Sequence, residues 1–285
     1  MPAVQRKPFW LLPNLLSLDA PLVAVAWLHV FAKTWRLYLP WEAYASLGLT
    51  VWMIYVADRL LDISMFEGST MILEPRHQFH RDHRGLFRGG LGLALLVTLL
   101  LVFTRMPMNL YKYLVFGVLL LAGFFGLSMI SSHERHEVSY TKNIFAGIAF
   151  AFGTAMIAHL YRYELRVEDL IASGEFKCFA VLCVLNICAI DLWEHAAHSP
   201  DPEVKARDEL ALTLPVTLLG SATIAYAVFV DQIASRPFFY AVLTGSALLY
   251  VLNRCRQRFS MDALRALADV ALLIPVLVFL AASRG

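Results

Sequence analysis

Two aspartates, Asp58 and Asp62, lie four residues apart at the end of an apolar stretch. In a helix this spacing places both carboxylates on one face, about one turn apart. Two like charges there need a cation, and Mg²⁺ is commonly held by one or two carboxylates together with substrate phosphates. The pair therefore predicts a Mg²⁺ site.

A second acidic cluster contains Asp191, Glu194 and His195 and lies far along the chain from the first. When the two clusters are superimposed, Asp191 matches Asp58, but the match is short and chance similarity is the alternative. If the match is real, two metal sites face each other across a cavity and bracket a diphosphate. Lys142 would then neutralise the remaining negative charge.

The segment 63–88 is the most polar stretch of the chain, and we expect it to be a loop capping the cavity. Arg76, Arg81 and Arg84 are suited to clamping a diphosphate bidentately; the alternative is a basic loop that contacts lipid headgroups. Three histidines recur here at every third residue, a tolerable spacing for zinc on a helix. We favour no metal there, because a fourth ligand is missing and the interleaved arginines would repel a cation.

The elements that must position these residues are hydrophobic helices, because 59% of the 285 residues are hydrophobic and only 16% are charged. Apolar stretches long enough to cross a bilayer recur along the whole chain, too closely spaced for a soluble domain between them. We predict an all-α, polytopic membrane protein with residues 1–285 forming a single domain. The nine predicted spans are 14–32, 43–62, 89–104, 112–131, 143–160, 176–196, 210–230, 238–253 and 263–282.

The distribution of lysines and arginines predicts which end faces the cytoplasm. With the N-terminus inside, most of the 24 basic residues fall on the inner side, as the positive-inside rule requires. We therefore expect a cytoplasmic N-terminus, a retained leader and a multi-pass protein in contact with membrane lipid. The net charge of +2 indicates no nucleic-acid partner. No pattern of small residues indicates an oligomeric state.

Ionisable residues inside predicted spans cluster near one membrane face. Besides the two acidic clusters, Asp19, Lys142 and Asp269 lie near span ends on that side. Charges in lipid are costly without partners, so five helices contributing polar groups at similar depth predict one cavity open to the cytoplasm. The alternative is that each group reaches its own membrane interface.

With these residues in place, the chain resembles the UbiA superfamily of intramembrane prenyltransferases. The resemblance spans nearly the whole chain and rests on motifs in order along it. They are the Asp58-x-x-x-Asp62 pair, the basic segment after it, Tyr140-Thr-Lys142-Asn143, Asn186 with Asp191, and Leu214-Pro215-Val216. It implies nine transmembrane helices around a central cavity that carries two aspartate-rich motifs.

The chain departs from the family pattern at three positions. Ile54 stands where the first motif usually begins with asparagine, and His195 stands where the second motif usually has another aspartate, with Glu194 beside it. Val138 replaces a frequent tyrosine, with Tyr140 nearby. The first metal site is therefore expected to be mostly intact and the second altered.

The resemblance implies Mg²⁺-assisted ionisation of an isoprenyl diphosphate and transfer of the prenyl group to a lipophilic acceptor, with an aromatic one favoured. Residues expected at the metals are Asp58, Asp62, Asp191, Glu194 and His195. Residues expected at the substrates are Lys142, Arg76, Arg81, Asn186, Tyr140 and Tyr55. The alternatives are a terpene cyclase on the same scaffold, which needs no acceptor, and a transporter-like or non-catalytic membrane protein.

Overall fold

The computed structural model describes residues 11–65, 75–131, 139–162, 166–230 and 232–283, and over these residues the chain is helical. Within these described residues, nine helices are long. They are α2 (Asp19–Thr34), α3 (Trp41–Met65), α5 (Arg84–Arg105), α6 (Leu110–Ser131), α7 (Tyr140–His159), α9 (Gly174–His198), α10 (Pro202–Phe229), α11 (Arg236–Cys255) and α12 (Met261–Ala282). Three shorter α-helices are α1 (Leu12–Leu15), α4 (Pro75–Asp82) and α8 (Val167–Ala172). Two 3₁₀ turns, Ile233–Ser235 and Arg256–Arg258, flank α11.

Each predicted span overlaps one long helix, and seven of these helices are long and apolar enough to cross a membrane. The chain thus has the helices of an integral membrane protein, as predicted. The other two long helices are α2, which has 16 residues, and α3, whose mean hydropathy is lowered by Asp58, Arg59 and Asp62. Nine crossings therefore remain a prediction.

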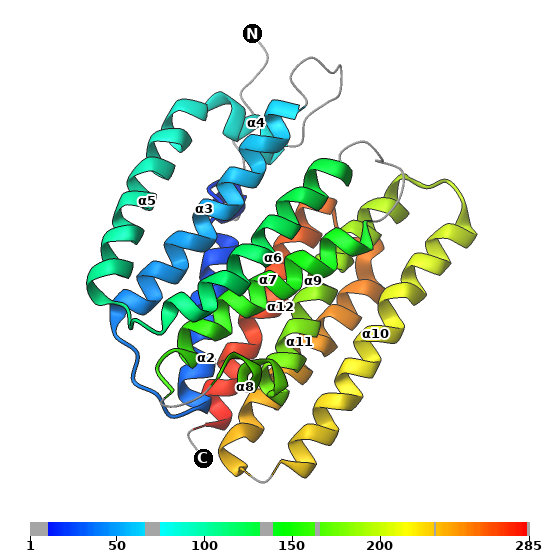
Figure 1. Ribbon diagram of the computed structural model, residues 1–285. Coiled ribbons are helices and arrows are strands. Elements are labelled where there is room, and N and C mark those ends of the chain that lie inside the picture. The colour runs from blue at the N-terminus through cyan, green and yellow to red at the C-terminus, as the bar shows by residue number, and fades with distance from the viewer. Residues whose placement is uncertain (1–10, 66–74, 132–138, 163–165, 231, 284–285) are drawn as a thin grey trace.

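Helix α9 lies in the middle of the bundle and packs against α7, α10, α11 and α12 (Figure 1). It has the largest buried share among the seven apolar helices. Helix α2 packs on α3, α7 and α12. Helices α5 and α6 are peripheral, since α5 packs mainly on α3 and α6 mainly on α7, and both expose large apolar side chains. Functional side chains on α9 are thus held by four neighbouring helices.

Tilted and edge-to-face aromatic rings pack against one another in the bundle interior. The Phe179 ring lies 4.5 Å from Trp27 and 5.4 Å from Phe31, and Phe238 lies 5.0 Å from Phe31. The Trp27 indole donates a hydrogen bond of 2.8 Å to the Leu272 carbonyl, which joins α2 to α12. These fully buried rings come from the ends of α2, α9 and α11 remote from the acidic residues.

Helices α7 and α9 approach closely at Gly147. A Cβ atom at this position would lie 2.6 Å from the Cα of Val184, so no larger residue fits without moving a backbone. The contact sits one turn from Asn143 and fixes the spacing between the two helices.

The predicted loop 63–88 is largely helical, which corrects that expectation. Helix α3 continues to Met65, α4 follows, and α5 begins at Arg84, while residues 66–74 lie outside the described residues. Helix α4 packs on α1 and α3. His80 of α4 is fully buried, 3.2 Å from Ser17 Oγ, and its ring stacks on Phe87 at 4.0 Å. His80 is thus a core side chain, and the prediction of no metal at the three histidines stays a prediction.

Candidate active site

Polar side chains gather at one end of the bundle, which we call the polar end. It is formed where α2, α7, α10 and α12 begin and where α3, α9 and α11 end (Figure 1). Consecutive long helices run antiparallel, so the end of one helix and the start of the next lie at the same end of the bundle. The polar end carries the acidic residues predicted on α3 and α9 together with several that sequence reasoning missed.

Tyr55 marks the point where helices of the polar end converge. Its hydroxyl lies within electrostatic range of the carboxylates of Asp19, Asp58 and Asp269 and of the Cys183 side chain. These groups come from α2, α3, α12 and α9. The structure thus brings the first predicted carboxylate together with two acids from other helices, around a tyrosine that was expected to bind substrate.

Asp58 and Asp62 are both half-buried on α3, so neither is fully withdrawn from solvent. Arg59, between them in sequence, is buried and donates a hydrogen bond to the Asn14 carbonyl. The Asn14 amide in turn donates a 2.7 Å hydrogen bond to Asp19. The arginine therefore ties α3 to the segment before α2 and helps to hold Asp19 near the acidic pair.

Asn186 presents a buried hydrogen-bond acceptor without a partner. Its side chain is only 5% exposed, and its Oδ1 has no hydrogen-bond partner in the described part of the chain. Asn186 lies three residues after Cys183 on α9, so both face the same side of that helix. Because Cys183 lies within electrostatic range of Tyr55, Asn186 belongs to the side of α9 nearer to Tyr55. An unsatisfied buried acceptor costs about 1–3 kcal/mol unless a ligand or water meets it.

Asp191 is held by Asn143, which donates a hydrogen bond of 2.7 Å from its amide to Asp191 Oδ2. Asn143 is buried at the start of α7, and the bond crosses the close α7–α9 contact. The second predicted acidic cluster is thus anchored to the Lys142-Asn143 motif, in which Asn143 had been assigned no binding role.

The other two residues of the second cluster have protein partners. Glu194 accepts hydrogen bonds of 2.7 and 3.0 Å from Arg265 of α12. His195 Nδ1 lies 2.7 Å from Oδ2 of Asp208, a buried residue of α10. Neither Arg265 nor Asp208 was predicted at the site. The expectation that Glu194 and His195 bind metal is untested, and both now have a structural role as well.

The remaining predicted residues lie around this centre. Lys142 Nζ lies 5.9 Å above the Phe124 ring of α6, and exposed Tyr140 lies within electrostatic range of Asp208. Arg81 is exposed on α4, 3.7 Å from Asp82. Arg76 belongs to α4, but its side chain lies outside the described residues. The structure thus places Lys142 against α6 and Arg81 beside Asp82.

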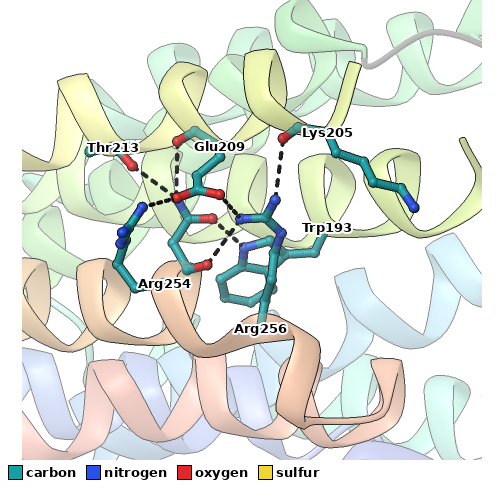
Figure 2. Close-up of polar contacts among 7 residues, drawn as sticks. Trp193, Lys205, Glu209, Thr213, Arg254 and Arg256 are labelled. Carbon is teal, nitrogen blue, oxygen red and sulfur yellow. Dashed lines mark hydrogen bonds and ion pairs between the residues drawn. The ribbon is translucent and has the colours of Figure 1, made fainter. Parts of the chain in front are cut away.

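Figure 2 shows the polar network that fixes α9 against α10 and α11. The Trp193 indole donates a 3.0 Å hydrogen bond to Asn253 Oδ1, and Asn253 donates from its amide to the Glu209 carbonyl. The Glu209 carboxylate pairs with Arg254 and, at 3.0 Å, with Arg256. Further bonds reach the Lys205 carbonyl and Thr213 Oγ1. Since Trp193 lies between Asp191 and Glu194, the network sets the rotation of the acidic end of α9.

No family model, no curated protein and no solved structure matches the chain. Within the described residues, His, Cys, Asp and Glu side chains also form no group of three arranged to hold a metal by themselves. The UbiA resemblance thus depends on the residues of this chain alone.

Proposed function

We propose that the protein is a Mg²⁺-dependent intramembrane prenyltransferase that ionises an isoprenyl diphosphate and transfers the prenyl group to a lipophilic acceptor. The observation that carries the proposal is the convergence of Asp19, Asp58 and Asp269 on Tyr55 at one end of a bundle of apolar helices. Such acidic groups inside a membrane protein are costly and mark functional sites. An amphiphilic substrate matches a site that is acidic at one end and apolar beyond it.

The donor set fits Mg²⁺. Carboxylates and the unsatisfied amide oxygen of Asn186 are hard oxygen ligands, and Mg²⁺ takes few protein ligands because it retains waters and substrate phosphates. Asp58 and Asp62 would hold one ion, and Asp191 would hold a second. Bound there, Mg²⁺ would neutralise the charge that develops on the departing diphosphate.

The protein's own residues orient and enclose the reactants. Asn143 holds the Asp191 carboxylate, and Arg59 joins α3 to Asn14, whose amide holds Asp19. The ring of Tyr55 offers a π face to an allylic cation. The aromatic rings around Phe179 limit how far an isoprenoid tail can extend. In this proposal the acidic end binds the diphosphate, and the aromatic core selects the length of the isoprenoid tail.

The proposal is tested by reconstituting the purified protein in liposomes with isoprenyl diphosphates, Mg²⁺ and a set of lipophilic phenols. We expect Mg²⁺-dependent release of diphosphate and a prenylated phenol. Asp58→Asn should lower the rate by about 100-fold or more, since it removes a metal ligand. The control is Glu168→Gln, an exposed carboxylate on α8. No consumption of any isoprenyl diphosphate by the wild-type protein would favour a non-catalytic or transporter-like role.

A terpene cyclase is the second candidate, and the pairing of Glu194 with Arg265 favours it. This pairing makes the second acidic cluster differ from a plain diphosphate-binding motif. A cyclase captures the cation with the substrate's own double bonds. Release of a cyclised hydrocarbon or alcohol in reactions without acceptor would identify a cyclase and exclude the transferase.

A further inference from the structure

The end of α10 and the start of α11 lie at the end of the bundle opposite the polar end (Figure 1). A groove lies between these two helix ends. It has a volume of about 270 Å³. Its α10 wall includes Ala227 and Val228, and its α11 wall includes Leu243. Val228 is 61% exposed, so the groove opens toward the surface that faces lipid. Its walls are mainly apolar.

Arg236 is the cation of this groove. It opens α11, is half-buried, and its Nε is buried without a hydrogen-bond partner. Two other arginines have carboxylate partners: Arg265 pairs with Glu194, and Arg256 pairs with Glu209. In the described residues no carboxylate forms an ion pair with Arg236. A partly buried cation without a counter-ion is costly, so this site calls for an anion.

The position of Arg236 selects the kind of anion. It begins a helix that is long and apolar enough to cross a membrane, so we expect it near the level where lipid headgroups meet the hydrocarbon. A guanidinium binds phosphate oxygens through two parallel N–H donors. The positive end of the α11 dipole likewise favours a bound anion. Tyr240, one turn further and 44% exposed, adds a hydroxyl beside the groove.

We propose that the α10–α11 groove binds one anionic phospholipid, with Arg236 on the headgroup phosphate and an acyl chain along the apolar walls. The volume suits part of one acyl chain. The site is separate from the polar end and does not depend on the proposed enzymatic activity.

The test is native mass spectrometry of the purified full-length protein in a non-ionic detergent, titrated with phosphatidylglycerol. We expect one lipid to bind tightly, and Arg236→Gln to weaken that binding by about tenfold or more, the usual effect of losing a charged hydrogen bond. The control is Arg105→Gln, an exposed arginine that ends α5 at the same end of the bundle. Equal binding by the wild type and Arg236→Gln would overturn the proposal.

A second variant tests the groove itself. Val228→Trp adds bulk on an exposed position and should reduce lipid binding while leaving Arg236 intact, whereas Leu96→Trp on the lipid-facing side of α5 should not. Inorganic phosphate and oleate distinguish the headgroup from the acyl chain: neither should displace the bound phospholipid. Displacement by phosphate alone would identify an anion site and contradict the lipid proposal, as would unchanged binding by Val228→Trp.

Discussion

At the scale of single residues, the acidic side chains of the polar end divide into two kinds. Asp58 and Asp62 are half-buried on α3, near a tyrosine and acids from other helices. Glu194 and His195 instead form pairs with Arg265 and Asp208 that tie α9 to its neighbours. The first kind is suited to binding a ligand, and the second contributes to holding the bundle together.

The His195–Asp208 pair allows a direct test of that division. Asp208→Ala leaves His195 Nδ1 without its buried acceptor, so we expect the free energy of unfolding to fall by about 1–3 kcal/mol. Thermal unfolding in detergent measures the change. Glu203→Ala, an exposed position earlier on α10, is the control and should change little. Equal stability of the two variants would show that the pair is not structural.

At the scale of helices, hydrophobic pattern predicted which elements exist but not all of their ends. Helix α10 was expected to begin at residue 210, and it begins at Pro202, capped by Asp201 through a 2.8 Å bond to the Glu203 amide. Its first turns are polar, so hydropathy does not detect them. The Asp201-Pro202 pair is a helix-start signal that indicates the earlier boundary.

The earlier start of α10 explains why one residue of the site, Asp208, was not predicted. Asp208 fell outside the predicted span, so it was not considered as a partner for His195. The Glu194–Arg265 pair joins helices far apart in sequence, and such pairing depends on how α9 and α12 rotate against each other. Spacing along one helix, as for Asp58 and Asp62, is readable from the sequence; contacts between helices are not.

The α7–α9 contact makes a prediction about helix spacing. Gly147→Ala introduces a Cβ that would overlap Val184, so we expect a loss of about 1–3 kcal/mol in stability and a weaker Asn143–Asp191 bond. Gly153→Ala on the same helix has open space and should be neutral or stabilising by about 0.5–1 kcal/mol. Thermal unfolding and the rate of diphosphate release measure both effects. A harmless Gly147→Ala would contradict the close contact.

The network of Figure 2 makes a second prediction at this scale. Trp193→Phe keeps one aromatic six-membered ring but removes the N–H that Asn253 accepts and some buried volume, so we expect about 1–3 kcal/mol of destabilisation or more. Trp41→Phe is the matched control, because Trp41 is 67% exposed on α3. If both tryptophan variants unfold at the wild-type temperature, the network does not stabilise α9.

At the scale of the whole molecule, the open question is how many helices cross the membrane. Helix α3 has 25 residues, which at about 1.5 Å per residue exceeds the roughly 30 Å of hydrocarbon in a bilayer. We therefore expect α3 to cross despite its polar end. Tyr38, between α2 and α3, and Arg81, on α4, should then lie on opposite sides of the membrane.

Labelling of single cysteines measures this arrangement. Tyr38→Cys and Arg81→Cys, both at exposed positions, would be introduced after replacing the four native cysteines and treated with an impermeant maleimide in vesicles of known orientation. We expect opposite accessibility of the two positions. Labelling of both from the same side would mean that α3 does not cross.

The central claim is that the polar end is a single site for Mg²⁺ and a diphosphate. Calorimetric titration of the reconstituted protein with a non-hydrolysable isoprenyl thiodiphosphate tests it without requiring the acceptor. We predict that Mg²⁺ tightens binding by about tenfold or more and that Asp58→Asn abolishes this gain, while Glu168→Gln retains it. Binding that is absent, or that is equally strong without Mg²⁺ and in Asp58→Asn, would contradict the account.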